Sequence, residues 1–242
     1  MSATPTPEPL ANASATVERA SYRAFLQSDV ADDEVMRLAA RLRDDAERLK
    51  AEGLALTVVL ARYGRQLYAY VEHIVPRHPA RRSMTAVTGF PEARGWFDGA
   101  LERCPQFSGD VFWTYMHPVF WFDEPTSVDS FRRGRQPDAR CGRIAHFYPD
   151  TVIDYVVHHQ LIAREGLAVG DRYQFISVLD DVAFSYFETP RDREQVNIRR
   201  EEGESREIRR WLDADPFSHF DHFDPGTLER DFLVIDTLVS VG

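Results

Sequence analysis

The segment TVIDYVVHHQLI, residues 151–162, carries the side chains of this chain best suited to proton transfer. Its apolar spacing predicts a helix, on which Tyr155 and His159 lie four positions apart on one face. Histidine titrates near neutrality, so His159 can take or give a proton, and Tyr155 can orient the imidazole or hold a substrate hydroxyl. The apolar neighbours predict that this pair faces inward, and the spacing alone leaves its role open. A core histidine that bonds only a tyrosine or a carbonyl is the structural alternative.

The neighbouring histidine, His158, faces about 100° away on the same helix and follows Asp154 by four residues. We expect His158 and Asp154 to form a solvated pair on the outer face. Such a pair contributes little to stability and predicts no functional role.

Composition narrows the class of protein to which the chain can belong. The 242 residues are 43% hydrophobic, enough to bury a sizeable core. The net charge of -10 argues against nucleic acid or an anionic membrane surface as a partner. Two short basic clusters, RHPARR and FRRGRQ, are expected to be solvated loops. No apolar run approaches the roughly 20 residues that span a bilayer, which predicts a soluble protein.

Motifs for metal and nucleotide binding are missing from the sequence. Cys104 and Cys141 have no CxxC spacing, and the eight histidines form no HExxH set, so neither a metal nor another cofactor is expected. We find no GxGxxG, GxxxxGK[ST] or GxSxG, the motifs of nucleotide binding and serine hydrolysis. The first residues lack the order of a secretory signal, and a reducing cytoplasm is the expected compartment.

One order of elements occurs twice along the chain. Residues 21–29 predict a strand, 32–53 a helix and 54–73 a strand hairpin, followed by a helix at 93–104 and an aromatic segment at 110–122. The order recurs as a strand at 141–148, the helix at 151–166, paired strands at 173–179 and 182–188, a helix at 205–215 and a final strand within 228–241. The motifs LYAYVE and AFSYFE align Tyr70 with Tyr186 and Glu72 with Glu188.

This repetition predicts an α+β fold of two tandem ferredoxin-like βαββα units. Their sheets should pack into an intramolecular barrel of the dimeric α/β-barrel type, since each sheet needs a cover on its second face. The predicted divisions are a disordered tail at 1–18, a first unit at 19–125, a linker at 126–139 and a second unit at 140–242. A barrel completed within one chain can remain a monomer or form a homodimer.

The second unit resembles the L-rhamnose mutarotases, small dimeric α/β-barrel proteins. The resemblance rests on RIAHFYPDTVIDYVVHHQ, YQFISVLDDVAFSYFE and IRRWL. It implies a substrate-binding role for Tyr155 and a proton-donating role for His159. It places Phe175 and Trp211 at the aromatic substrate-binding positions, with Leu212 where the family has a second tryptophan. Tyr186, on the neighbouring strand, completes the candidate substrate-binding residues of this unit.

The first unit resembles the same family in its closing segment FWTYM, where Phe112 and Trp113 take the paired aromatic positions. Its helix, however, carries Glu34 and Leu38 where the tyrosine and histidine belong. The two units should therefore be chemically unequal, with a degenerate site in the first.

The resemblance implies a cofactor-free isomerase that interconverts the anomers of a reducing sugar such as a 6-deoxyhexose. The same barrel type hosts cyclases, isomerases and cofactor-free monooxygenases of natural-product pathways, so a polyketide-like substrate is the alternative. A heme protein similar to chlorite dismutases, with a histidine as axial ligand, is a third reading. A binding protein without catalysis is the fourth, favoured if His159 only packs against the core.

Overall fold

The computed structural model describes residues 15–76, 95–191, 197–198, 205–223 and 231–242. Its first strand, β1 (Ala15–Phe25), begins six residues before the expected Ser21, so residues 15–18 of the predicted tail belong to the sheet. Alternate residues of β1 at Ala15 and Val17 are buried, which explains why the strand extends this far. Residues 1–14 lie outside the described part.

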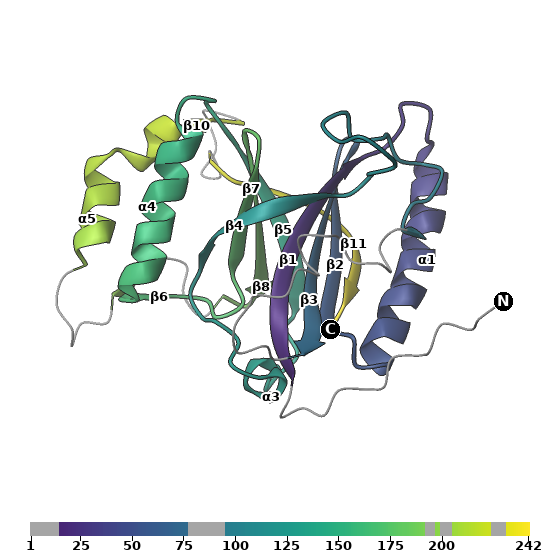
Figure 1. The fold of residues 1–242 in the computed structure, drawn as a ribbon, viewed down its shortest axis with the longest axis horizontal. Helices are drawn as coiled ribbons and strands as arrows, with labels where there is room; N and C mark the ends of the chain where they lie inside the picture. Colours follow the sequence, from purple (N-terminus) through teal and green to yellow (C-terminus); the bar gives the residue numbers. More distant parts are fainter. Residues whose placement is uncertain (1–14, 77–94, 192–196, 199–204, 224–230) are drawn as a thin grey trace.

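A closed antiparallel barrel forms the centre of the molecule (Figure 1). Within the described residues, eight strands close in the order β5-β11-β2-β3-β1-β4-β7-β8, and β8 pairs back to β5. Besides β1, these strands are β2 (Ala55–Tyr63), β3 (Gln66–Pro76), β4 (Thr114–Trp121), β5 (Ala139–Phe147), β7 (Phe175–Leu179), β8 (Val182–Thr189) and β11 (Leu233–Val241). The expected barrel within one chain is confirmed.

The two halves of the chain contribute their strands in matching orders. The first half of the chain contributes neighbouring strands in the order β2-β3-β1-β4. The second half contributes β7-β8-β5-β11, which is the same order when the strands of each half are counted along the chain. The halves join at two seams, where β11 pairs with β2 and β4 pairs with β7. Both seams are antiparallel and both contain a register shift, which marks a local irregularity of the ladder.

Helices cover the barrel on opposite sides (Figure 1). Helix α1 (Asp32–Ala51) buries Val35, Leu38, Leu42 and Leu49, the apolar stripe of its sequence, against the first half. Helix α4 (Val152–Glu165) lies on the other side with α5 (Arg206–Asp213) beside it. The remaining short elements are α3 (Val128–Phe131), β6 (Ala168–Val169), β9 (Asn197–Ile198), the 3-10 helix η4 (Pro216–His219) and β10 (Phe220–Asp221).

The described residues form four apolar clusters, of which the smallest joins the start of β1 to α3 and the other three lie between these layers or inside the barrel. One joins α1 to the outer face of the first half, and a second joins α4 and α5 to the outer face of the second half. The third fills the barrel itself and contains Tyr68, Tyr70, Phe175, Phe184 and Tyr186. Side chains of adjacent strand positions point to opposite faces, so Phe175 enters the barrel whereas Ile176 faces the helices.

The helix expected at residues 93–104 does not form over its described part, residues 95–104. These residues make turns and one isolated bridge between Leu26 and Leu101. Phe97 and Gly99 adopt positive φ angles of 60° and 76°, which a right-handed helix excludes. The apolar side chains Trp96, Phe97 and Leu101 are nevertheless buried.

The predicted linker at 126–139 is more structured than its polar composition indicates. Ser127 caps α3 through a reciprocal pair of bonds with Ser130, and Phe131 is fully buried. Arg133, from the cluster expected to be a solvated loop, is 7% exposed in its side chain. No helix in the described part of the chain is long and apolar enough to cross a membrane.

Candidate functional site

His159 lies between α4 and the outer face of the barrel, among aromatic rings. Its ring centroid is 3.9 Å from that of Tyr155, 5.0 Å from that of Trp211 on α5 and 5.5 Å from that of Phe120 on β4. The structure thus brings together Tyr155, His159 and Trp211, which were predicted as one site, although Trp211 follows His159 by 52 residues in the sequence. Phe120 was not among the predicted residues.

Hydrogen bonding selects one tautomer of His159. Its Nδ1 lies 3.0 Å from the carbonyl oxygen of Tyr155, which can only accept, so Nδ1 carries the proton. Within the described residues, Nε2 forms no hydrogen bond. Burial lowers the pKa of His159 to about 4, although the bond to the Tyr155 carbonyl opposes this shift. At neutral pH, Nε2 is therefore an unprotonated base.

The Tyr155 hydroxyl remains protonated at neutral pH. The residue is 1% exposed and packs against Phe147 and Phe220, and burial raises its pKa above the ordinary value. A neutral phenol can donate a hydrogen bond or a proton. The stacked rings of Tyr155 and His159 consequently offer one donor and one acceptor side by side.

A second group of polar side chains lies next to this pair, and one member, His219, was not predicted. Asp154 accepts a hydrogen bond from Nε2 of His219 at 2.8 Å and lies 3.6 Å from Nε2 of His158. The expected pair of Asp154 and His158 exists, but its solvated character is wrong for His158, whose side chain is 16% exposed. His219 follows α5 in η4, and the ring of Trp211 lies between it and His159 in contact with both.

The other predicted substrate-binding residues lie elsewhere. Phe175 and Tyr186 point into the barrel, on the face of the sheet opposite to His159. Phe112 and Trp113 pack against the cluster beneath α1, with Trp113 beside Trp96 at 6.5 Å between ring centroids. On α1, Glu34 is paired with Arg37 at the surface and Leu38 is buried, so no acid–base pair forms at this pair of positions.

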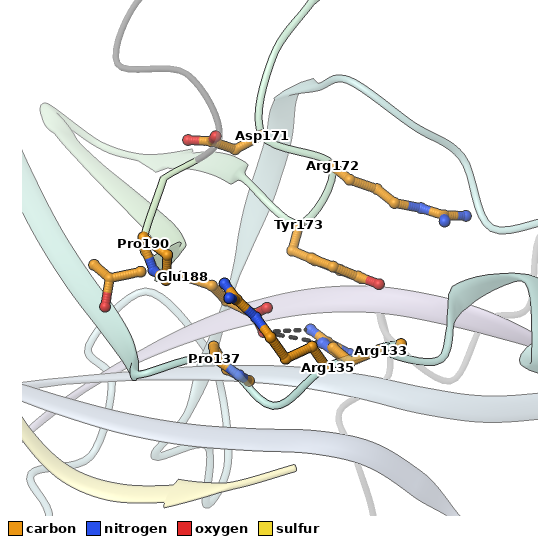
Figure 2. Close-up of a pocket in the computed structure, with 10 residues that line it drawn as sticks. Arg133, Arg135, Pro137, Asp171, Arg172, Tyr173, Glu188 and Pro190 are labelled. Carbon is orange, nitrogen blue, oxygen red and sulfur yellow. Dashed lines mark hydrogen bonds and ion pairs between the residues drawn. The ribbon is translucent and has the colours of Figure 1, made fainter.

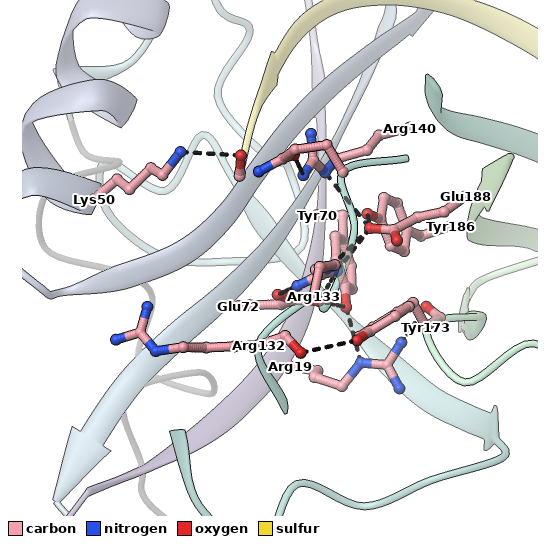
Figure 3. Close-up of polar contacts among 12 residues, drawn as sticks. Arg19, Lys50, Tyr70, Glu72, Arg132, Arg133, Arg140, Tyr173, Tyr186 and Glu188 are labelled. Atoms are coloured by element: carbon pink, nitrogen blue, oxygen red, sulfur yellow. Dashed lines mark hydrogen bonds and ion pairs between the residues drawn. The ribbon is translucent and has the colours of Figure 1, made fainter. Parts of the chain in front are cut away.

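The barrel interior holds a charged network around the repeated motifs (Figure 3). Tyr70 and Tyr186 stack with their centroids 3.8 Å apart. Each hydroxyl donates to the glutamate two positions along its own strand, Tyr70 to Glu72 at 2.8 Å and Tyr186 to Glu188 at 2.5 Å. Arg133 donates to both carboxylates and so links the two halves of the barrel.

Arg133 keeps Glu72 ionised in a buried setting. Burial alone would raise the pKa of Glu72, but the guanidinium of Arg133 holds it below its ordinary value. Burial also raises the pKa of Tyr70 and of Tyr186, so both phenols stay neutral. Sequence analysis missed Arg133. The available signal was the pair of glutamates on two buried strands, because buried carboxylates need a cation.

A cavity of about 200 Å³ opens beside this network (Figure 2). It lies between the segment after α3, the loop before β7 and the end of β8. Its walls comprise residues 133–135, Pro137, residues 171–173 and residues 188–190. None of these residues belongs to α4 or α5, so the cavity is separate from the surroundings of His159.

The described residues contain no cluster of three or more histidine, cysteine, aspartate or glutamate side chains arranged to hold a metal ion. His158, His159 and His219 all contact the ring of Trp211. What this arrangement offers chemically is an unprotonated imidazole nitrogen, a neutral phenol and aromatic surfaces.

Comparison with known proteins gives matches to structures only. No family model matches the sequence, and no curated protein is significantly similar to it. A putative monooxygenase from Lactobacillus acidophilus NCFM aligns over 94% of this chain and 96% of its own, with 9% identity and a TM-score of 0.39. A putative monooxygenase from Fusobacterium nucleatum subsp. nucleatum ATCC 25586 covers 94% of both chains, with 7% identity and a TM-score of 0.41. Similarity at this level does not assign a reaction to this chain.

Proposed function

We propose that this protein is a cofactor-free enzyme in which Nε2 of His159 removes a proton from a small organic substrate. The observation that carries the proposal is the fixed tautomer of His159, whose Nδ1 is bonded to the Tyr155 carbonyl while Nε2 has no partner within the described residues. A base that is unprotonated at neutral pH and surrounded by apolar rings needs no activation by a metal.

Interconversion of sugar anomers fits this pair of groups. Opening the hemiacetal of a reducing sugar requires a base to take the anomeric hydroxyl proton and an acid to protonate the ring oxygen. His159 supplies the base, and the neutral Tyr155 hydroxyl supplies the acid. This reverses the proton-donating role that the mutarotase resemblance implies for His159, because burial lowers the pKa of the imidazole. Trp211 covers the apolar face of a pyranose such as a 6-deoxyhexose.

A polyketide-like substrate is the second candidate, and the composition of the His159 surroundings favours it. Three aromatic rings, those of Tyr155, Trp211 and Phe120, contact the imidazole. Flat aromatic molecules stack on such rings, whereas a sugar requires several polar partners for its hydroxyl groups. Removal of an acidic proton by His159 would begin a cyclisation, an isomerisation or a cofactor-free oxygenation with dioxygen.

We also propose that the chain consists of two tandem units and that only one of them carries an active site. The matching strand orders of the two halves support two ferredoxin-like units, near 19–125 and 140–242. The stacked Tyr70 and Tyr186, with their paired glutamates, support the same view. Only the second unit carries the tyrosine and histidine on its helix, so one active site per chain is expected, in a monomer or in each subunit of a homodimer.

Anomer exchange measured by saturation-transfer NMR tests the proposal on the purified protein. The panel begins with rhamnose and other 6-deoxyhexoses and continues with common hexoses, each compared with buffer alone. Faster exchange of any sugar supports the mutarotase assignment. If no sugar exchanges faster than in buffer, that assignment fails, and oxygen consumption with phenolic and polyketide-like substrates tests the second candidate. A visible spectrum with a Soret band would contradict both and indicate heme.

A further inference from the structure

The cavity beside Glu188 has walls of mixed charge (Figure 2). Arg133, Asp171, Arg172 and Glu188 of these walls are already paired. Arg172 pairs with Asp123 at 2.8 Å, and Asp171 pairs with Arg191 at 2.6 Å. In each pair one residue lines the cavity and the other does not. They shape the wall but leave little charge for a ligand.

Two polar groups of the wall remain available. Arg135 forms no hydrogen bond or ion pair with any other described residue, and its side chain is exposed. Glu188 accepts bonds from Tyr186 and Arg133 through Oε1 alone, and among the described residues its Oε2 has no partner. The wall therefore offers one cation and one hydrogen-bond acceptor.

The acceptor is fixed in position, which distinguishes the cavity from an ordinary surface depression. Glu188 is 9% exposed and is held by Tyr186, by Arg133 and by Arg140 at 3.5 Å. Its free oxygen cannot turn away without breaking this network. A ligand group that donates a hydrogen bond to Oε2 would meet a preorganised partner.

We infer that this cavity binds a small hydroxylated carboxylate, with the carboxylate on Arg135 and the hydroxyl donating to Oε2 of Glu188. Guanidinium groups bind carboxylates in a planar, two-bond geometry, which favours this class over a neutral ligand. The volume of about 200 Å³ corresponds to about seven water molecules at about 30 Å³ each, and so to a ligand of similar size. This site is independent of His159 and of the reaction proposed for it.

Titration of the full-length protein with lactate, followed by amide NMR, tests the inference. Lactate should give saturable shifts at Gly134, Arg135 and Thr189. Lactamide lacks the charge and propionate lacks the hydroxyl, so each should bind roughly tenfold more weakly than lactate. A tenfold change corresponds to about 1.4 kcal/mol of binding free energy. Arg135→Gln should weaken the binding of lactate by roughly tenfold or more.

Arg132→Gln is the matched control, since Arg132 is exposed, lies next to the same segment and does not line the cavity. It should keep lactate binding within roughly twofold of the wild type. His159→Asn should leave lactate binding unchanged, which separates this site from the proposed active site. The inference is overturned if lactate gives no saturable shifts at these amides, if lactamide binds as well as lactate, or if Arg135→Gln and Arg132→Gln bind lactate equally.

Discussion

Glu72 and Glu188 occupy equivalent positions on two strands 116 residues apart in sequence and share one guanidinium, that of Arg133. Each also accepts a hydrogen bond from a tyrosine of its own strand, and the two tyrosines stack. Two buried carboxylates near each other repel unless a cation lies between them. Arg133 is thus the cation that offsets the repulsion between the two carboxylates in the barrel.

Replacement of Arg133 should be strongly destabilising. Arg133→Met leaves Glu72, which is fully buried, without its ion-pair partner, and leaves Glu188 with Arg140 alone. Loss of one partner of a buried ion pair costs about 3–5 kcal/mol. Arg132→Met, at an exposed neighbour, should change the free energy of unfolding by less than about 1 kcal/mol. Urea denaturation measures both values. Adding Glu72→Gln to Arg133→Met should restore part of the loss, and an unchanged double variant would contradict the network.

Barrel closure depends on a close approach at Gly142 of β5, which pairs with Tyr186 of β8. A Cβ atom at Gly142 would lie 2.8 Å from Cε2 of Phe184 and 3.0 Å from Cβ of Ala61. Gly142→Ala should therefore reduce stability by about 1–3 kcal/mol, the cost of overpacking a core. Gly134→Ala meets no atom within 4 Å and serves as the control in thermal denaturation. Equal melting temperatures for the two variants would refute the close packing of Gly142 against Phe184 and Ala61.

Much of the fold could be predicted from local sequence, whereas the residues that connect its parts could not. The equivalence of Tyr70 with Tyr186 was visible because both lie in strands of the same pattern. Arg133 was missed because a guanidinium in a polar connector has the same local pattern whether solvent or two carboxylates surround it. His219 was missed for a similar reason, since its contact with Asp154 joins positions 65 residues apart.

Two predicted features failed for identifiable reasons. The apolar spacing of residues 95–104 fits a helix, but positive φ angles at Phe97 and Gly99 turn the backbone while the same side chains stay buried. The mutarotase resemblance placed Phe175 at a substrate-binding position beside His159, and Tyr186 was added from the neighbouring strand. The two-residue period of their strands places them on the other face of the sheet.

Stability should fall with acidification because buried histidines stay neutral in the fold. Burial lowers the pKa of His73 to about 3, below the value near 6.5 expected in the unfolded chain. As pH falls below 6.5, the unfolded state gains a proton that the folded state does not, so the stability present above that pH is lost. One such histidine lowers the free energy of unfolding by about 2 kcal/mol between pH 6.5 and pH 5.0.

His73→Gln should reduce this pH dependence, as measured by urea denaturation at the two pH values. The exposed His117 provides the control, and His117→Gln should keep the wild-type dependence. The wild type and His73→Gln losing the same stability between pH 6.5 and 5.0 would show that His73 titrates in the folded protein as it does when unfolded.

The rate of the proposed reaction should have an unusual pH dependence. A base must be unprotonated to act, and burial lowers the pKa of His159 to about 4. Activity expressed as kcat/KM should therefore be constant from about pH 8 to pH 5 and should decline below that, with a midpoint near 4. A decline centred near pH 6.5 would indicate a solvated histidine as the base.

The most direct test of the central claim compares His159→Asn with His158→Asn for the substrate that the wild-type protein turns over. A general base contributes about 10²- to 10⁴-fold, so His159→Asn should reduce kcat/KM by that factor while the melting temperature and most ligand affinity are retained. His158→Asn, on the adjacent position of α4, should retain activity within roughly threefold, because His158 pairs with Asp154 and does not offer the free Nε2. Full activity in folded His159→Asn, or loss of activity in His158→Asn alone, would contradict the assignment of His159 as the catalytic base.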